Sequence, residues 1–266
     1  MTRLSVAIVS HGHEAMLPAC LGSLAKALDG IDYEVILLDN LGAGHAEPLL
    51  RAAFPGGRFV ANSEQQGFAA NANRVALLAS GEYLLLLNPD TEYRCGSIGG
   101  ALQFLDDNTD VAVLGCRMLY PDGRPQQSCR QFPTLPVIVA RGLGADYWPL
   151  RPRYYRLRMM EGVPITAPSI VDWVFGAFLL VRRSQFLAIG GMDPKFRLYY
   201  EDVDLCYRFR AQGFGTAIFP GLEFFHRHMR SSAARPFGRL WRWHLRSSCR
   251  FLRKHRYLFR HGMRQA

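Results

Sequence analysis

The first half of the chain alternates apolar runs with amphipathic segments, which is the pattern of an open α/β sheet. Apolar runs at residues 4–9, 33–38 and 83–87 predict buried strands, and the third ends abruptly in the polar residues 88–90, as a central parallel strand does. The same pattern predicts helices at 16–28, 67–78 and 97–105 and further strands at 58–61 and 111–114. We therefore expect a mostly parallel central sheet flanked by helices.

The periodicity is lost between about residues 120 and 168, where prolines and arginines are interspersed with aromatic residues. We interpret this region as a flexible excursion that shapes a pocket. Regular patterns resume with a strand at 171–181 and with residues 216–219, which lead into 223–226.

From residue 236 onward the chain is basic, and its pattern predicts an amphipathic helix. Arginines recur every three or four residues, and apolar residues take the opposite side. The arginines are Arg235, Arg239, Arg242, Arg246, Arg250 and Arg253, and the apolar residues are Phe237, Leu240, Trp241, Leu245, Phe251 and Leu252. We therefore divide the chain into a domain at residues 1–232 and a basic helical extension at residues 233–266.

Composition narrows the class of protein. With 266 residues and 49% apolar content, the chain can bury a substantial core. Its formal charge of +10 indicates an anionic partner: phosphates, a lipid surface or nucleic acid. The N-terminus becomes polar too early for a signal peptide, and no apolar run is long enough to span a membrane, so we expect neither secretion nor membrane integration. Six scattered cysteines favour reduced thiols in the cytoplasm.

Three carboxylates lie among aromatic and apolar residues just before a predicted helix. They are Glu201, Asp202 and Asp204. Acidic residues in a first helical turn have a plain structural explanation, because they cap the helix and interact favourably with its dipole. A carboxylate beside two tyrosines is also partly desolvated, and desolvation raises its pKa toward that of a general base. Spacing alone does not separate the two explanations.

Polar residues follow two of the predicted strands. Asp39 and Asn40 follow one strand and Asp90 follows another, so all three are expected along the sheet edge where ligands bind. Each also has an ordinary explanation as a turn residue. Asp90 with an imidazole from His226 or His228 suits a hydrated Mg²⁺ or Mn²⁺ that clamps a diphosphate, although a lone histidine is more often structural. No glycine-rich phosphate loop is present, so such a site must use metal and arginine.

These motifs recur in a known family order across roughly residues 3–255. They comprise residues 4–9, 38–40, Asn62 with 67–73, 87–90, 173–177, 190–193, 199–205, and His226 with Ser231. Together they resemble the family 2 inverting glycosyltransferases of GT-A fold, in particular the bacterial rhamnosyltransferase-like branch. The resemblance implies an α/β GT-A fold: a single nucleotide-diphosphosugar-binding domain, followed here by the amphipathic helix.

The resemblance implies a donor site at the strand ends. Asp39 would hold the donor's pyrimidine base. Asp90 stands where the family's metal-binding Asp-x-Asp motif ends, and Asn88 replaces the first acid of that motif. His226 matches the metal-proximal histidine better than His228, because Ser231 and Ser232 follow it at the expected interval. The implied donor-binding residues are Ser10, His11, Asp39, Asn40, Asn73, Asn88 and Asp90, and the implied ligands of Mg²⁺ or Mn²⁺ are Asp90 and His226.

The resemblance also implies the chemistry. Asp202 matches the family's catalytic base, which takes the proton of the acceptor hydroxyl as its oxygen attacks the anomeric carbon. Metal and cationic groups stabilise the departing diphosphate on the other face of the sugar. The implied acceptor-binding residues are Trp173, Gly176 and Glu201, and Trp173 also has an ordinary explanation as a core residue.

The leading hypothesis is transfer of a sugar, with rhamnose as a candidate, from a dTDP- or UDP-sugar to an acceptor hydroxyl of a cell-surface polysaccharide or a polyprenyl-linked glycan. The protein is expected in the cytoplasm, with attachment to the inner face of the plasma membrane left open. The basic helix would dock on an anionic membrane, with Trp241 and Trp243 at the interface, or would lie near the donor phosphates.

Two other classes remain open from the sequence alone. A non-catalytic nucleic-acid-binding protein fits the charge, but the chain has no recognised nucleic-acid motif. A nucleotidyltransferase fits the α/β pattern, but its glycine- and lysine-rich loop is missing.

Overall fold

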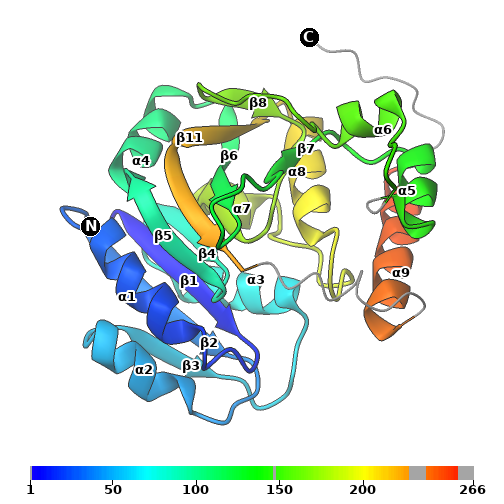
Figure 1. The fold of residues 1–266 in the computed structure, drawn as a ribbon. Coiled ribbons are helices and arrows are strands. Elements are labelled where there is room, and N and C mark those ends of the chain that lie inside the picture. Colours follow the sequence, from blue (N-terminus) through cyan, green and yellow to red (C-terminus); the bar gives the residue numbers. More distant parts are fainter. Residues whose placement is uncertain (1, 146–147, 228–237, 257–266) are drawn as a thin grey trace.

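The centre of the fold is a twisted sheet (Figure 1). The computed structural model describes residues 2–145, 148–227 and 238–256. In this part of the chain the strands of the main sheet are β1 (Leu4–Ser10), β2 (Tyr33–Asp39), β3 (Arg58–Ala61), β4 (Tyr83–Leu87), β5 (Thr91–Gly96), β6 (Val111–Leu119), β8 (Ser169–Val171), β10 (Phe178–Arg182) and β11 (Gly215–His226). Their order is β3-β2-β1-β4-β10-β6-β11-β5, with β8 also paired to β11. Only β5, β8 and β10 oppose the common direction, so the sheet is mostly parallel, as predicted.

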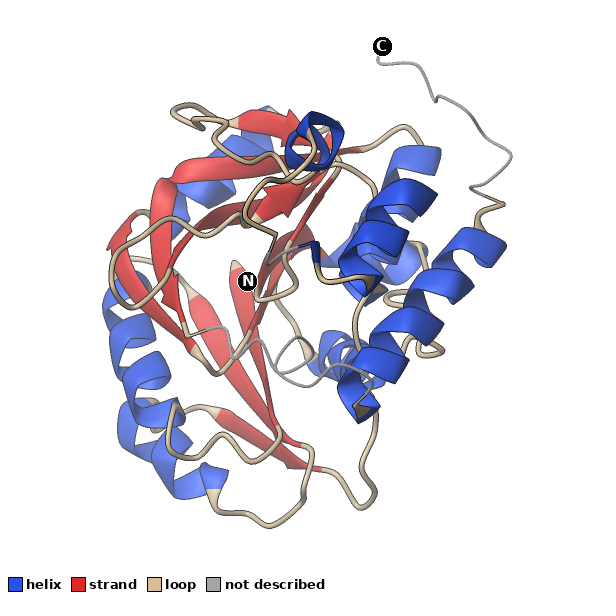
Figure 2. Ribbon diagram, turned by 45° about the vertical axis from the view of Figure 1, so that its right-hand side comes forward, coloured by secondary structure: helices blue, strands red, loops and turns tan. Residues whose placement is uncertain are grey.

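Helices cover both faces of the sheet, and each face has its own hydrophobic core (Figure 2). One face carries α1 (Leu17–Ala27), α2 (Ala46–Ala53) and α4 (Ile98–Asp107). The other carries α3 (Phe68–Leu78), α7 (Arg183–Ala188) and α8 (Glu201–Ala211). All five residues of β4 are buried, because the strand is covered on both sides. The strand therefore reads as a continuous apolar run.

Three short elements are missing from the sequence-based prediction. The helix α2 buries only Ala46 and Leu50, α7 buries only Phe186, and β5 buries only Thr91. Elements this short span too few turns or alternations for the pattern to distinguish them from loops.

The single strand predicted at residues 171–181 is wrong. The chain forms β8, then β9 (Trp173–Val174), and re-enters the main sheet only at β10. β9 pairs instead with β7 (Cys129–Arg130). The break at residues 175–177 has a local cause, since the backbone N–H of Gly176 donates to the carboxylate of Asp202 at 3.0 Å. The apolar sequence of residues 171–181 therefore does not reveal that the strand is interrupted where Gly176 contacts Asp202.

The excursion at residues 120–168 contains regular structure that its sequence does not predict. It includes β7 and two short helices, α5 (Leu135–Gly142) and α6 (Arg153–Arg158). The helices share a small core of their own, built from Val137, Ala145, Tyr155 and Met159. Helices of this length span about two turns, too few for a clear period. The expectation that the whole region is irregular is therefore corrected.

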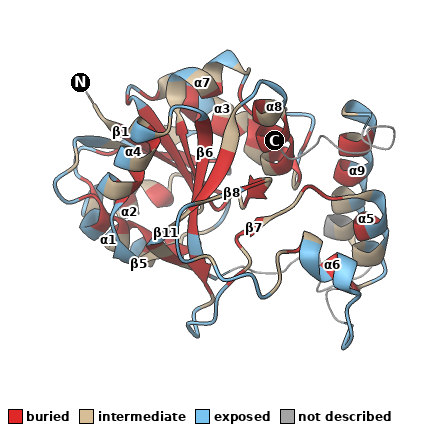
Figure 3. Ribbon diagram, turned by 90° about the horizontal axis from the view of Figure 1, so that it is seen from above, coloured by how far each residue is buried: buried red, intermediate tan, exposed pale blue. Residues whose placement is uncertain are grey.

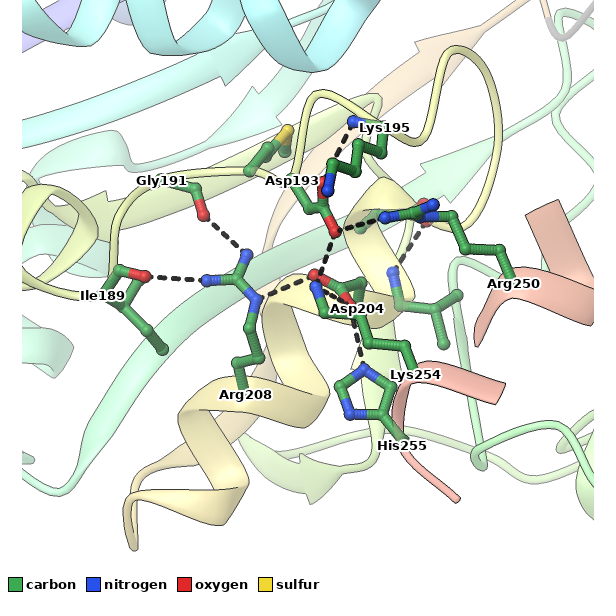
Figure 4. A network of polar contacts seen from close by, with 12 residues as sticks. Ile189, Gly191, Asp193, Lys195, Asp204, Arg208, Arg250, Lys254 and His255 are labelled. Carbon is green, nitrogen blue, oxygen red and sulfur yellow. Dashed lines mark hydrogen bonds and ion pairs between the residues drawn. The ribbon is translucent and has the colours of Figure 1, made fainter. Parts of the chain in front are cut away.

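The C-terminal helix α9 (Arg239–Lys254) packs beside α8 through a buried cluster of charges (Figure 4). The fully buried carboxylate of Asp204 contacts Arg208 Nε at 2.7 Å, Lys254 Nζ at 2.7 Å and His255 Nε2 at 2.8 Å. Lys254 also reaches Asp193 at 2.8 Å. Burial opposes ionisation of Asp204, but these cations outweigh it and lower its pKa to about 2.

The proposed boundary between the domain and the extension remains a prediction. It falls in residues 228–237, which lie outside the described part of the chain, as do His228, Ser231, Ser232, Arg235 and Phe237.

We predict that Asp204→Asn destabilises the fold by roughly 2–3 kcal/mol at neutral pH, because it removes the buried carboxylate that pairs with Arg208 and Lys254. The pKa of Asp204 is depressed in the folded state, so its contribution is present above its unfolded pKa of about 4 and is lost as the pH falls toward 2. Chemical denaturation at several pH values should show the difference narrowing toward acid. Glu47→Gln, in the exposed pair with Arg51 on α2, is the control and should have little effect. A constant difference across pH would contradict this account.

Candidate active site

A cavity of about 810 Å³ opens at the carboxyl-terminal ends of the parallel strands. The segments that follow β1, β2 and β4 line one side of it, and the region 120–161, the turn before α8 and part of α9 line the rest. The predicted site residues that the structure brings together around it are His11, Asn40, Asn88, Asp90, Trp173, Gly176, Glu201, Asp202 and His226. Its size suits a small-molecule ligand.

Asp90 and His226 face each other in the cavity. Asp90 follows β4, and His226 ends β11, so neighbouring parts of the sheet bring Asp90 Oδ2 to 3.4 Å from His226 Nε2. Burial raises the pKa of Asp90, but the hydrogen bond and charge of His226 outweigh it, so the pKa lies below its usual range. Asp90 is therefore a carboxylate under ordinary conditions.

Gln126, which sequence reasoning missed, determines how His226 is oriented. Gln126 Nε2 donates to the backbone carbonyls of His226 at 2.6 Å and Leu119 at 3.3 Å. Gln126 Oε1 must then face His226 Nδ1, at 3.0 Å, and accept its hydrogen. A neutral imidazole then has its lone pair at Nε2, toward Asp90, whereas an imidazole that also carries a proton on Nε2 donates it to Asp90. Two acceptors at this distance require a proton or a metal ion between them.

The residues present therefore fit a divalent cation that is held together with its substrate. In the described ranges, no three His, Cys, Asp or Glu side chains converge to form a closed metal site. Asp90 and His226 offer two ligands, and Mg²⁺ or Mn²⁺ commonly completes its coordination with water and phosphate oxygens. The hydrogen bond that His226 Nδ1 donates to Gln126 is of the kind that orients a metal-binding histidine.

Asp202 and Glu201 begin α8 and lie side by side in the cavity wall. Asp202 Oδ2 accepts the backbone N–H of Gly176 at 3.0 Å, and Oδ1 accepts that of Val203 at 2.8 Å. Glu201 Oε2 is buried and has no hydrogen-bond partner among the described residues. Burial raises the pKa of both carboxyls, and the charge of Asp202 raises the pKa of Glu201 further, well above its usual range. The predicted desolvation of this segment is confirmed.

The turn that leads into this pair is strained. Tyr199 and Tyr200 both adopt left-handed backbone conformations, with φ of 66° and 69°. Such conformations cost about 1–3 kcal/mol each in residues other than glycine and cluster at functional sites. The ring of Tyr200 is buried against Phe251 of α9 at 5.7 Å, which helps to hold the turn. Strain here positions the first residues of α8 against the cavity.

Asn40 ties together the loops on the donor side of the cavity. Its Oδ1 accepts from Asn62 Nδ2 at 2.8 Å and from the backbone N–H of Gln66 at 2.9 Å. Its Nδ2 lies 3.0 Å from His11 Nδ1 and donates to the Gln66 carbonyl at 3.0 Å. Asn62 continues the network to Asn71 on α3 at 2.7 Å. The amides connect β1, β2, β3 and α3 at the sheet edge.

Three predicted donor-binding residues do not line the cavity. Asp39 is fully buried, and its two oxygens accept the backbone N–H groups of Leu41 and Gly44, each at 3.0 Å. Ser10 is also fully buried. Asn73 exchanges two hydrogen bonds with the backbone of Met192, at 2.7 and 2.8 Å. In the structure these residues shape the loops around the site, and their contact with a donor remains a prediction.

Aromatic side chains and an arginine form the wall beside Gly176. Trp173 stacks on Phe175 with ring centroids 5.7 Å apart, and its Nε1 donates to the Gln131 carbonyl at 3.0 Å. The guanidinium of Arg130 lies 5.6 Å from the Trp173 ring and 4.8 Å from that of Phe175. Trp173 is both largely buried and exposed to the cavity, so the two explanations of it coexist. The positions of Arg130 and Phe175 had no signal in the sequence.

The helix α9 reaches the rim of the cavity. Its Trp243 packs against Arg197, with 5.1 Å between the guanidinium carbon and the ring centre. His244 lies 5.4 Å from the rings of both Tyr199 and Tyr200. Trp243 thus lines the cavity through its contact with Arg197, and its expected position at a membrane interface remains a prediction.

Comparison with known proteins identifies the family of this chain. Residues 5–178 match the family described as Glycosyl transferase family 2. "Rhamnosyltransferase WbbL" of Escherichia coli (strain K12) is 28% identical over 267 residues, which cover 95% of this chain and 94% of that protein. The "N-acetylglucosaminyl-diphospho-decaprenol L-rhamnosyltransferase" of Mycobacterium tuberculosis (strain ATCC 25618 / H37Rv) is 29% identical over 248 residues, which cover 89% and 80%.

A solved structure supports the fold independently. GalNAc-T7, crystallised with UDP, GalNAc and Mn²⁺, superposes with a TM-score of 0.64 at 17% identity. The match covers 84% of this chain and 43% of that one. The fold is thus the GT-A fold, and the chain is an enzyme that belongs to glycosyl transferase family 2.

Proposed function

We propose that this enzyme transfers rhamnose from a dTDP- or UDP-linked donor to an acceptor hydroxyl of a polyprenyl-linked or cell-surface glycan, with inversion at the anomeric carbon. The observation that carries the chemistry is the half-buried Asp202 carboxylate, held by two backbone N–H groups in the cavity that also contains Asp90 and His226. The names of the two curated relatives support the sugar. Family membership removes the nucleic-acid-binding and nucleotidyltransferase alternatives.

The base is assigned to Asp202 by its hydrogen bonds. Two buried carboxylates in adjacent positions cannot both ionise without a large penalty, so they share less than two negative charges. The backbone N–H groups of Gly176 and Val203 stabilise a charge on Asp202, whereas Glu201 Oε2 has no such partner in the described structure. Asp202 therefore carries the charge and Glu201 the proton.

Asp202 then accepts the proton of the acceptor hydroxyl as the oxygen forms its bond to the anomeric carbon. The bond from that carbon to the nucleoside diphosphate breaks in the same step, and the configuration inverts. Arg130, above the rings of Trp173 and Phe175, contributes positive charge near Asp202 and helps to keep it ionised. Trp173 offers the acceptor or the sugar a flat apolar surface.

Asp90 and His226 would hold the divalent cation on the donor side, Mg²⁺ or Mn²⁺, with Gln126 fixing the imidazole. When bound, such an ion neutralises charge that develops on the departing diphosphate. Asn40 and His11 border the same side of the cavity, and their rigid network preorganises it. A lipid-linked acceptor places the enzyme at the cytoplasmic face of the plasma membrane.

The proposed activity is tested by incubating the purified chain and Mn²⁺ with dTDP-, UDP- and GDP-sugars and a lipid-linked N-acetylglucosaminyl diphosphate. We expect rhamnose to appear on the acceptor. Asp202→Asn should lower kcat by about 10²–10⁴-fold, as loss of a general base does, while thermal shift still detects donor binding. The exposed Asp122→Asn is the control and should be fully active. Failure to release nucleoside diphosphate from any donor would refute the proposal.

Glu201→Gln separates the roles of the two carboxyls. The pKa of Glu201 is raised in the folded state, so wild-type stability should fall as the pH rises above about 4.3, its unfolded value, while the variant lacks this loss. The variant's melting temperature should therefore gain on wild type as the pH rises, whereas exposed Glu64→Gln runs parallel to wild type. Glu201→Gln should also keep most of the activity. If Glu201→Gln lost as much kcat as Asp202→Asn, the assignment of the base to Asp202 alone would be wrong.

Gln126→Leu tests the metal assignment without touching a ligand. Loss of a group that orients a ligand weakens metal binding by about 10–100-fold, so the Mn²⁺ concentration for half-maximal activity should rise by that factor while kcat at saturation recovers. Gln103→Leu, at an exposed position of α4, should leave the metal dependence unchanged. An unaltered Mn²⁺ requirement in Gln126→Leu would show that His226 does not bind the ion.

A further inference from the structure

Exposed apolar side chains gather on one small part of the surface. Of the thirteen large hydrophobic residues that are exposed in the described structure, eight lie between residues 135 and 163. They are Leu135, Val139, Leu143, Trp148, Leu150, Tyr154, Leu157 and Val163. We refer to these residues and the arginines between them as the α5–α6 surface. Scattered exposed apolar residues are ordinary, but a concentration of this kind marks an interaction site.

The helix α5 separates this surface from the cavity. Leu135, Val139 and Leu143 recur at every fourth position and expose 44%, 51% and 70% of their surface, the exposure rising along the helix. Arg141, on the opposite side of the same helix, lines the cavity. A helix is about 10–12 Å across, so a partner on the outer face lies that distance from the cavity wall.

The charge of the surface indicates what it contacts. Residues 135–161 contain five arginines and two acidic residues, Asp146 and Glu161, and Arg141, Arg151 and Glu161 of this set also line the cavity. Glu161 is shared by Arg151, at 2.7 Å, and Arg156, at 3.8 Å. Arg153 is exposed on the same short helix as Arg156. The partner should therefore be both apolar and anionic.

The α5–α6 surface continues onto α9. Figures 1 and 3 show α5 and α9 side by side. Arg242, Arg246 and Arg253 are exposed along one side of α9, and Leu245, which is 40% exposed, lies among them. The two neighbouring helices thus expose aliphatic residues, and α9 adds three arginines beside them.

We propose that the α5–α6 surface docks on an anionic lipid bilayer. Single aliphatic side chains inserted between arginines, with an aromatic ring from Trp148 and another from Tyr154, match the composition of interfacial membrane-binding elements. Among the described helices none is long and apolar enough to cross a bilayer, so contact of this type would be peripheral. Docking would hold the cavity one helix width from the membrane, where the lipid-linked acceptor of the proposed function resides. This role for the docking surface rests on the proposed function.

The proposal is tested by sedimenting the full chain with phosphatidylcholine vesicles that contain or lack phosphatidylglycerol. The wild type should bind the anionic vesicles, and high salt should weaken the binding. The double variant Val139→Ser with Leu143→Ser should lower the partition coefficient by about tenfold or more, because it removes inserted aliphatic groups. Arg153→Glu with Arg156→Glu should abolish the preference for phosphatidylglycerol. Leu157→Ser on α6 provides a second apolar variant should the first fold poorly.

The matched controls lie on helices outside the α5–α6 surface. Leu77→Ser on α3, at a site that is 69% exposed, and Lys26→Glu on α1 should bind vesicles as the wild type does. All variants should release nucleoside diphosphate normally with a short water-soluble acceptor, so a failure of docking is distinguishable from a failure of the proposed activity. A wild type that ignores vesicles, or controls that lose as much binding as the test variants, would overturn the proposal. The proposal would also be overturned if light scattering showed that the wild type is a dimer and that Val139→Ser with Leu143→Ser dissociates it, since the surface would then join two copies of the chain.

Discussion

The proposed active site depends on two adjacent carboxyls at the beginning of α8, Glu201 buried and Asp202 half-buried. Loss of water disfavours a charge on either of them, and two backbone N–H groups that point at Asp202 favour a charge there. One of these comes from Gly176, which is available only because the chain leaves the main sheet between β9 and β10. The other comes from the first turn of α8, where the helix dipole also favours a negative charge. The irregular sheet and the strained turn at Tyr199 and Tyr200 thus serve one carboxylate.

The helix α8 connects the chemistry to the C-terminal helix. Asp202 faces the cavity, and Asp204, two residues later and so on the opposite side of the helix, faces Lys254 and His255. The charge cluster around Asp204 positions α9, and α9 in turn presents Trp243 and His244 at the cavity rim. Capping and catalysis are therefore compatible explanations of the acidic segment, because its carboxylates point in different directions.

The sequence predicts the parts of the fold that bury continuous apolar runs. The strands β1, β2 and β4 and the helices α1 and α3 lie within a residue or two of the predicted positions, because both faces of the sheet are covered. Asp90 and His226 meet as predicted, since both follow from strand ends. Gln126 and Arg130 could not be predicted, because both lie in the aperiodic region, whose bridge between Leu119 and Pro125 and whose β7–β9 pairing leave no pattern in the sequence. Asp39 shows the converse case: its position at a strand end is typical of a ligand contact, and in the structure its oxygens accept N–H groups from its own loop, so its contact with a donor remains a prediction.

The arginine stripe of α9 shows why periodicity alone cannot assign a charged face. Arg250 belongs to the stripe in sequence, but it lies 3.5 Å from Asp193 and 5.4 Å from the ring of Phe196, in the contact with the domain. Asp193 and Asp204, the acids that hold this side of α9 against the domain, lie some fifty residues earlier in the chain, so the periodicity of the helix itself does not reveal them. Only Arg242, Arg246 and Arg253 remain outward among the stripe residues whose exposure is described. Salt in the surrounding water screens the attraction between three exposed cations and an anionic surface, so that attraction is weak. Stable contact with a bilayer therefore also requires the apolar residues of α5 and α6.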